Sequence, residues 1–385
     1  MRPPPILLPA FACIAVLLST AAAHAAKLVT VDQIQQILTT AHSENDAKLA
    51  DQLSSLEATE RIDTDTLTRW QATAPGSQTR QALLLLADSS AFLPLPHSRI
   101  VDQPPPDAAA LHQILAMTIA YLGKVLHNLP NFMAVRDTTQ FEDSPWRQEI
   151  DNAQSPDAHQ NVLSLDNASL AVGKPCFLPL SPSARKRMQV TYRDGHEIQV
   201  NLSKNDVDAG LASRGEFGPI LAVVLDDAFR QKLYWAYWEQ SAAGPIAAFR
   251  YSVPAGASHY IVAYPTDDGV KSIRPPYQGE IAIDPATGAV LRFTLIAAMP
   301  RPYQAIQAAL VVEYGPVVLG DRTYICPLRS VNLSREPLAG ESEAIAPTLR
   351  TALNDVSFTD YHLFRADARI LNSAHDNQPP PPHPR

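Results

Sequence analysis

Hydrophobic and polar positions alternate most clearly from Gly279 to Ala298, in the sequence GEIAIDPATGAVLRFTLIAA. The pattern predicts two strands joined by a tight turn at Asp284–Gly288. Asp284 can accept backbone hydrogen bonds at the start of the turn, Pro285 fixes its φ angle, and Gly288 supplies the left-handed residue of a bulged hairpin. This stretch therefore predicts an antiparallel hairpin.

The second strand of this hairpin has two unlike faces. Leu291, Phe293 and Leu295 share one face, whereas Arg292 and Thr294 share the other, so the alternation predicts one buried face. Similar segments on both sides predict an antiparallel sheet of about nine strands in mostly next-neighbour order. An entry strand is expected at residues 132–141, and the further strands of the sheet are expected at residues 188–192, 197–202, 232–240, 246–253, 259–264, 305–314, 323–333 and 353–361.

Helical spacing of apolar residues dominates the N-terminal part, residues 27–93. Four helices are predicted there, with caps at Thr30 (paired with Gln33), Ser43, Asp63 and Ser77. Prolines between residues 94 and 106 separate this part from a longer amphipathic helix at 107–129, which is expected to cover the sheet. A further helix is expected at 216–229, and the proline-rich tail 377–385 is expected to be disordered.

The first 25 residues have the pattern of a secretory signal peptide. An apolar run from Ile6 to Leu18 precedes small residues that end in Ala23-His24-Ala25. The run is shorter than the roughly 20 residues that span a bilayer, so we expect cleavage after Ala25 and a soluble periplasmic or secreted protein. An uncleaved anchor, or lipid attachment at Cys13, remains an alternative.

Charge and cysteine content indicate which kinds of partner and which covalent links are expected. Loss of the signal peptide removes one Arg and changes the formal charge from -8 to -9, and no basic stripe stands out, which disfavours nucleic-acid binding. Cys176 and Cys326 then remain. They can form a disulfide in an oxidising compartment, and two isolated buried thiols are the alternative.

Motifs for catalysis are missing: the sequence has no HExxH, GxSxG, P-loop, GxGxxG or CxxC. His259, or His362 with Asp360, could supply an acid-base group, but ordinary polar strand ends explain them as well. The pairs Asp226-Asp227 and Asp267-Asp268 are interpreted as solvated charges rather than a calcium site. We expect no cofactor and no metal.

The segment LYWAYW, residues 233–238, is the most aromatic in the chain. Aromatic residues on both faces predict a strand with apolar surroundings on both sides. It is either a central packed strand or one wall of a hydrophobic cavity. In the second case the ligand-binding residues are Trp235, Trp238, Phe249, Tyr251, Leu291, Phe293 and Leu295, and Val253 continues the same wall.

The order of these features resembles the periplasmic lipoprotein-carrier and lipoprotein-sorting family. The resemblance rests on the signal peptide, on AAFRYSVP and on GEIAIDPATGAVLRFTL with its Asp-x-x-Thr-Gly-x-x-x-Arg hairpin. Segments such as GEFGPIL, VEYGPVVLGDRTYICPLRSV and NDVSFTDYHLF are closer to uncharacterised secreted bacterial proteins with an N-terminal helical part. The resemblance implies an incomplete antiparallel barrel around a cavity for acyl chains, with Arg292 matching the hairpin Arg of the family.

The expected fold class is therefore α+β: a helical bundle at 26–93, a linker at 94–106, and an antiparallel β half-barrel with covering helices at 107–376. The expected function is a periplasmic, non-enzymatic binding protein for a lipid, lipoprotein or other hydrophobic envelope component. A structural or protein-interaction module with a filled core is the alternative, and an envelope hydrolase is the third hypothesis. Expected partners are a lipid or acylated protein, and an envelope protein bound through the N-terminal helices.

Overall fold

The structure is a computed structural model, and it describes residues 26–41, 44–142, 180–199, 213–266, 269–299, 307–337 and 349–363. Several predicted features lie outside these residues. They are the signal peptide with Cys13, the helix cap at Ser43, Cys176 of the predicted disulfide, Asp267-Asp268 and the tail 377–385. Predictions about these features stay predictions.

The N-terminal unit, residues 26–95, combines four helices with two short parallel strands around its own apolar core. Thr30 caps the first helix, and Gln33 completes the predicted capping box. Asp63 caps the third helix as predicted. The elements are β1 (Lys27–Val29), α1 (Val31–Thr40), α2 (Asp46–Ser54), β2 (Leu56–Ala58), α3 (Thr64–Thr73) and α4 (Ser77–Ser89).

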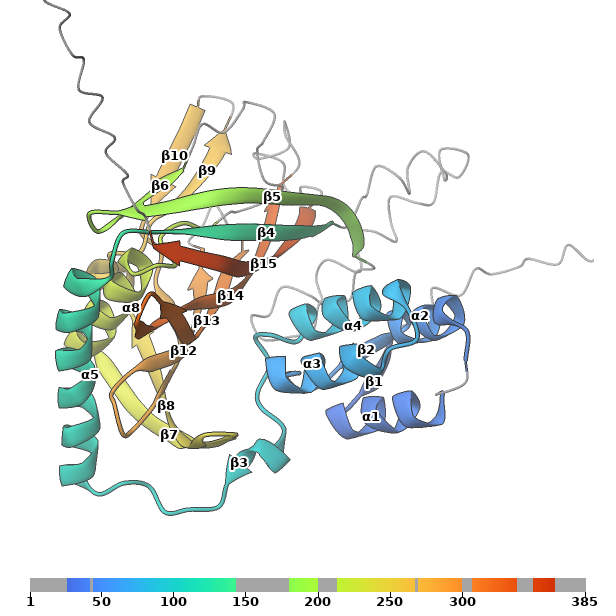
Figure 1. Ribbon diagram of the computed structural model, residues 1–385, viewed down its shortest axis with the longest axis horizontal. Coiled ribbons are helices and arrows are strands. Elements are labelled where there is room, and N and C mark those ends of the chain that lie inside the picture. Colours follow the sequence, from blue (N-terminus) through green and yellow to red (C-terminus); the bar gives the residue numbers. More distant parts are fainter. Residues whose placement is uncertain are drawn as a thin grey trace, which may run out of the picture.

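The rest of the described chain is dominated by one antiparallel sheet of eleven strands, which twists strongly from one end to the other (Figure 1). The early strand β4 pairs with the last strand, β15, so segments from the two ends of this part are neighbours in the sheet. In spatial order the strands are β3 (Ile100–Val101), β7 (Lys232–Ser241), β8 (Gly244–Val253), β11 (Tyr277–Ile283), β12 (Val290–Ala298), β13 (Gln307–Leu319), β14 (Arg322–Pro337), β15 (Leu349–Leu363), β4 (Phe132–Glu142), β5 (Ser181–Arg193) and β6 (His196–Gln199). Strands β9 (Val262–Thr266) and β10 (Gly269–Ile273) form a separate hairpin, and the 3-10 turns are η1 (His97–Arg99) and η2 (Ala255–Ala257).

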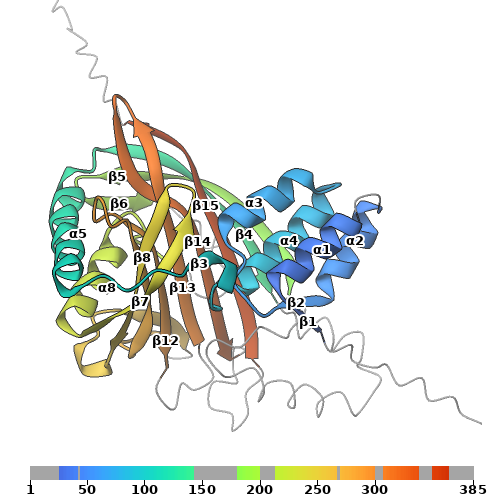
Figure 2. The same ribbon diagram turned by 90° about the horizontal axis from the view of Figure 1, so that it is seen from below.

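Both faces of the sheet are covered. The inner face carries Phe293 and Leu295 and packs against α5 (Ala108–Asn128) and α8 (Pro219–Arg230) in the largest apolar core. The outer face carries Val311 and Val331 and meets the end of α4 at Ala91. Figure 2 shows the sheet between α5 on one side and the N-terminal unit on the other. Among the described helices, none is long and apolar enough to cross a membrane.

The predicted fold class is wrong. The described structure has 46% of its residues in strands and 31% in helices, so a large sheet dominates rather than a helical bundle followed by a smaller half-barrel. Strands β1 and β2 have three residues each, too few to show alternation in the sequence. Strands β13 to β15 have 13 to 16 residues, longer than predicted. Their ends carry prolines, such as Pro316 in β13 and Pro337 in β14, which lie outside the predicted strand bounds.

The hairpin from Asp284 to Gly288 forms as predicted. The Asp284 carboxylate accepts hydrogen bonds from the Ala286 amide at 2.9 Å and from the Thr287 hydroxyl at 2.6 Å. Gly288 has a φ of +75°, and a Cβ atom at this position would lie 2.4 Å from the carbonyl carbon of Met117 in α5. Glycine is therefore required twice, for the left-handed turn and for the close approach of the helix backbone.

Candidate functional site

The predicted apolar ligand-binding residues lie mostly in the packed core of the inner face. Phe249, Tyr251, Phe293 and Leu295 are each 2% exposed or less and contact side chains of α5 and α8. Leu291 is half-buried because a bulge in the pairing of β11 with β12 leaves it between the paired residues Val290 and Arg292. The described inner face therefore has helix side chains where the predicted acyl chain would lie.

A second bulge brings the two tryptophans of β7 together. The register of β7 against β8 shifts between Trp235 and Tyr237, which changes which later residues face inward. Trp235 and Trp238 consequently make an edge-to-face contact with ring centroids 4.8 Å apart, and the Trp238 indole N–H donates to the Pro104 carbonyl at 3.0 Å. Simple alternation would have placed them on opposite faces.

Arg292, the polar residue suggested by the family resemblance, lies on the outer face. Its guanidinium donates to both carboxylate oxygens of Glu239, at 2.9 Å and 2.5 Å, and both residues are buried. Arg61 of the N-terminal unit approaches the same carboxylate at 3.9 Å. The prediction of a single buried face does not hold at β12, because Arg292 and Thr294 on the other face are buried as well. Arg292 thus faces the N-terminal unit rather than an apolar ligand.

His259 has a carboxylate partner that its sequence neighbours do not suggest. Asp227, fully buried in α8, lies 2.5 Å from His259 Nδ1, and accepts the His259 backbone N–H at 2.8 Å and the Tyr277 hydroxyl at 2.7 Å. Burial and this hydrogen bond raise the pKa of Tyr277. Asp226, Asp227 and His259 place possible metal ligands within 4.8 Å of one another. Both oxygens of Asp227 are engaged, however, and Asp226 pairs with Arg230 at 2.8 Å, so these contacts anchor the loop before β9 to α8.

The proposed pair of His362 and Asp360 is not brought together by any contact in the described structure. Asp360 has a φ of +50° at a bulge between Thr359 and His362, and its carboxylate binds Arg187 at 3.1 Å. The bulge breaks the alternation that would have placed the two side chains on one face. Cys326 is buried in β14. Its predicted partner lies outside the described residues, so the disulfide stays a prediction.

The sequence interpretation missed the exposed side of α5. The α5 outer stripe, defined here as Ala109, Ala116, Ile119, Ala120 and Gly123, faces away from the core beside the exposed His112 and Gln113, and Ile119 is 57% exposed. No Asp or Glu occurs anywhere in the 21 residues of α5. A surface helix usually places charged residues on its solvent side. The absence of acidic residues from this helix was the sequence signal that could have revealed the stripe.

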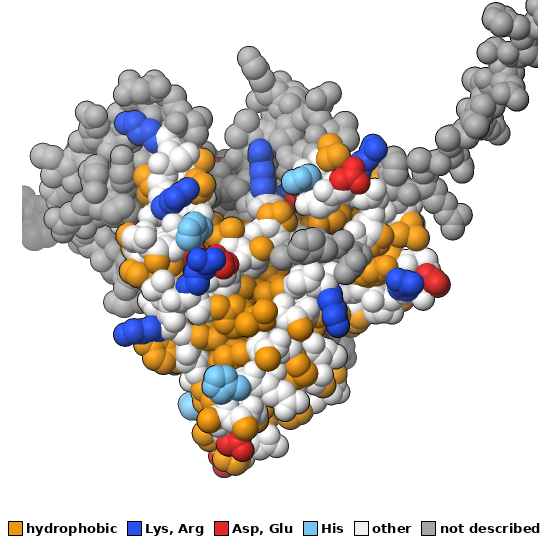
Figure 3. All heavy atoms as spheres, turned by 90° about the vertical axis from the view of Figure 1, so that its left-hand side faces the viewer, with side chains coloured by type: hydrophobic (Ala, Val, Ile, Leu, Met, Phe, Trp, Pro, Cys, Tyr) orange, Lys and Arg blue, Asp and Glu red, His pale blue; other side chains and the backbone are white. Residues whose placement is uncertain are grey.

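Figure 3 views the molecule from the side on which α5 lies. Hydrophobic side chains form a continuous area at the centre of this face, and Lys and Arg side chains, with some Asp and Glu side chains, lie around its margin. Exposed bases on α5 and on the neighbouring segment from α8 to β7 are Lys124, Arg230 and Lys232. An apolar area with Lys and Arg side chains at its margin stands out in a protein of formal charge -8.

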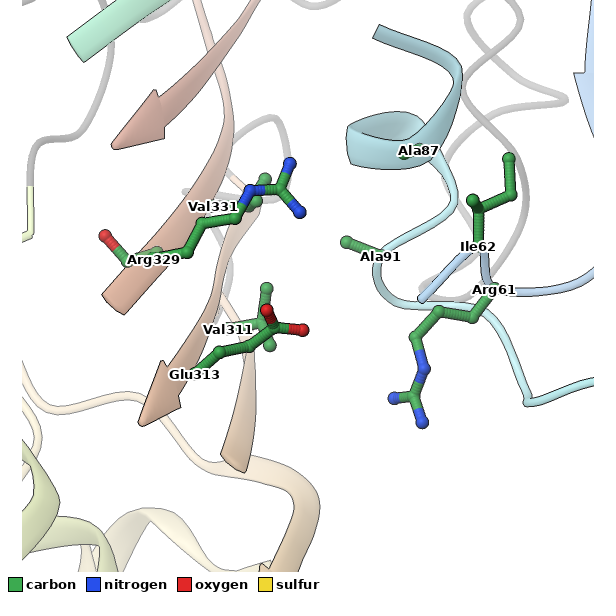
Figure 4. Close-up of a pocket in the computed structure, with 9 residues that line it drawn as sticks. Arg61, Ile62, Ala87, Ala91, Val311, Glu313, Arg329 and Val331 are labelled. Carbon is green, nitrogen blue, oxygen red and sulfur yellow. The ribbon is translucent and has the colours of Figure 1, made fainter. Parts of the chain in front are cut away.

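The N-terminal unit and the outer face enclose a small gap of about 10 Å³. Figure 4 shows Arg329 and Glu313 reaching into it from the sheet, opposite Ala87, Ala91 and Ile62. This volume is close to the minimum for one water molecule and is far too small for an organic ligand. The contact between the two parts is therefore nearly closed.

Comparison of the chain with protein-family models, with curated proteins and with solved structures found no match. The function must therefore follow from the chain's own side chains. Among the described surfaces, the α5 outer stripe combines the exposed Ile119 with a helix that has no acidic residue, a composition that solvent exposure alone does not explain.

Proposed function

We propose that this protein is a non-enzymatic binding protein of the cell envelope that attaches to a lipid surface through the α5 outer stripe. The observation that carries the proposal is the exposed Ile119, in the middle of a helix without acidic residues and among exposed lysine and arginine side chains. Helices that lie in a membrane interface combine an apolar face with basic residues that attract anionic headgroups. The occupant we propose is a bilayer surface containing anionic lipid.

The inner face of the sheet is filled by side chains of α5 and α8, which favours lipid binding on the outer surface of the molecule instead. Acyl chains bound between sheet and helices would have to displace Phe249, Phe293 and Leu295 from contacts with α5 and α8. Displacing well-packed core side chains forfeits several kcal/mol of packing, whereas the outer stripe is already exposed to solvent. The resemblance to lipoprotein carriers agrees with a lipid partner, and a periplasmic location remains part of this proposal.

The expected strength of binding is modest. Full burial of an isoleucine side chain contributes about 2 to 3 kcal/mol, so burying the exposed part of Ile119 contributes about 1 kcal/mol. The small residues of the stripe add less each. A nearby base adds at most about 1 kcal/mol at an anionic surface, and less where it is already paired, as Arg230 is with Asp226. Salt screens this contribution. Attachment should therefore be reversible and should weaken at high ionic strength.

The test is co-sedimentation of the mature protein with vesicles of phosphatidylglycerol and phosphatidylethanolamine, with phosphatidylcholine vesicles for comparison. We expect saturable binding to the anionic vesicles and at least tenfold weaker binding of Ile119→Glu, which removes apolar area and introduces a charge that lipid headgroups repel. Leu28→Glu is the matched control, because Leu28 is 54% exposed and belongs to the N-terminal unit on the other side of the sheet.

The two variants should have the same unfolding temperature as the wild type, because both positions are exposed. Equal binding of the two variants to anionic vesicles would exclude α5 as the attachment surface. Absence of binding by the wild type to any vesicle would exclude a lipid surface as the partner. The prediction that an envelope protein binds the N-terminal helices is independent of this test.

A further inference from the structure

One guanidinium joins the N-terminal unit to the sheet. Arg329 of β14 contacts the carboxylate of Asp88 in α4, and its Nε donates to Asp355 of β15 at 2.7 Å. Thr64 at the start of α3 donates its hydroxyl to Glu313 of β13 and accepts a hydrogen bond from Arg329 at 3.5 Å. Three carboxylates from three elements thus surround one arginine at the contact between the two parts.

The cluster is well shielded from water. Asp88 is completely buried, Asp355 is 8% exposed, and the Oδ2 atom of Asp88 has no hydrogen-bond partner in the described structure. The other charged groups facing this contact are Asp137 of β4 beside Asp355, and the group of Arg61, Arg292 and Glu239 at the neighbouring end of the interface.

The neighbouring charges offset only part of the negative charge around Arg329. Arg61 and Arg292 share Glu239, and Arg292 also lies opposite Glu313 in the pairing of β12 with β13. Around Arg329, three acids face one base. If all of them were ionised, the buried cluster would carry a net negative charge, which is costly in a medium of low dielectric constant.

A proton bound to one of these carboxyl groups reduces the excess of negative charge. Burial and the nearby Asp355 and Glu313 raise the pKa of Asp88 well above its ordinary value, although Arg329 opposes the shift. Burial also raises the pKa of Asp355. When the N-terminal unit leaves the sheet, Asp88 becomes solvated and returns to an ordinary pKa near 4. The docked state thus binds a proton that the undocked state releases at neutral pH.

We propose that the contact of Asp88, Asp355 and Glu313 with Arg329 is a pH-sensitive latch, which holds the N-terminal unit against the outer face and loosens as pH rises. The docked state binds more protons than the undocked one, so rising pH favours undocking. One retained proton changes the docking equilibrium by at most about tenfold per pH unit. The dependence ends once the docked cluster has itself lost the proton.

The consequence of release follows from what the N-terminal unit covers. Its removal would expose Val311, Val331 and Leu353 on the outer face, which pack against Ala91 in the docked state. An apolar sheet surface would then become available under alkaline conditions and covered under acidic ones. The latch is independent of the α5 outer stripe, which lies on the opposite side of the sheet (Figure 2).

The test compares the full mature chain with Asp88→Asn between pH 5 and pH 9. Small-angle X-ray scattering measures the overall dimensions, and hydrogen exchange, corrected for its intrinsic pH dependence, measures protection in α4 and β14. In the wild type we expect the radius of gyration to increase with pH and protection of both elements to fall by up to tenfold per pH unit. Asp88→Asn imitates the protonated carboxyl and should stay docked across the range.

Two controls distinguish the latch from other causes of a pH-dependent change in dimensions or protection. Asp65→Asn removes an exposed carboxylate of the same unit, with 66% of its side chain accessible, and should behave as the wild type. Glu57→Gln is added to the wild type and to Asp88→Asn, because Glu57 is a second buried carboxyl of the N-terminal unit whose titration could also change protection with pH. If Asp88→Asn fails to give native near-ultraviolet circular dichroism, Glu313→Gln replaces it and should reduce the same pH dependence.

Retention of the full wild-type pH dependence by a folded Asp88→Asn protein would overturn the latch. Constant dimensions and protection of the wild type from pH 5 to pH 9 would overturn it as well.

Discussion

Glu57 in β2 allows the sign and size of a pH effect on the N-terminal unit to be predicted. Its side chain is 5% exposed, and neither carboxylate oxygen has a hydrogen-bond partner in the described structure. Burial raises the pKa of Glu57 to about 7. A carboxyl without partners is easier to bury when it is neutral.

The direction of the effect follows from the raised pKa. Below the ordinary pKa of 4.5 the carboxyl is neutral in both the folded and the unfolded state, so it costs little. Between about pH 4.5 and pH 7 the unfolded state loses the proton while the folded state keeps it, and stability falls. One pKa unit corresponds to about 1.4 kcal/mol, so the loss is at most about 3.5 kcal/mol. We expect about 2 kcal/mol, because local opening lets water reach the side chain.

Glu57→Gln removes the ionisation and nearly keeps the shape. We expect the variant to match the wild type at pH 4.5 and to be more stable by about 2 kcal/mol at pH 8. Hydrogen exchange of the Lys27 and Thr59 amides, which donate to Ser55 and Val29 across β1 and β2, measures this stability locally. Asp51→Asn, at an exposed acid of α2, is the control.

Equal protection of wild type and Glu57→Gln at pH 8 would show that Glu57 is solvated or paired in solution. If the stability of the wild type instead rises with pH, the predicted direction of the effect is wrong.

Two further predictions concern the inner face. Phe293→Trp should lower the free energy of unfolding by about 1 to 3 kcal/mol, because Phe293 is fully buried among α5 and α8 side chains, whereas a ligand cavity would accept the larger ring at little cost; urea denaturation distinguishes the two. Gly288→Ala should destabilise by at least about 1 kcal/mol, since φ is +75° and the added Cβ would meet the α5 backbone at Met117. A thermal melt measures it against Gly256→Ala, where a Cβ has open space, and an unchanged melting temperature in Gly288→Ala would refute the close contact.

Local structure was the part of this protein that the sequence alone determined. The capping box at Thr30 and the hairpin at Asp284–Gly288 depend on residues a few positions apart, whose hydrogen bonds form within the same segment. The positions of α5 and α8 and of most strands follow from periodicity for the same reason. Such features require no knowledge of what the rest of the chain does.

Only the tertiary structure decided which faces meet and which charges pair. A one-residue bulge in β7 reverses the alternation and brings Trp235 beside Trp238. The partner of Arg292 is Glu239, 53 residues away, and the partner of His259 is Asp227 in another element. These pairs depend on strand order and register, which are set by contacts between distant segments. The same contacts leave the apolar stripe of α5 in solvent, and with it the surface on which the proposed function rests.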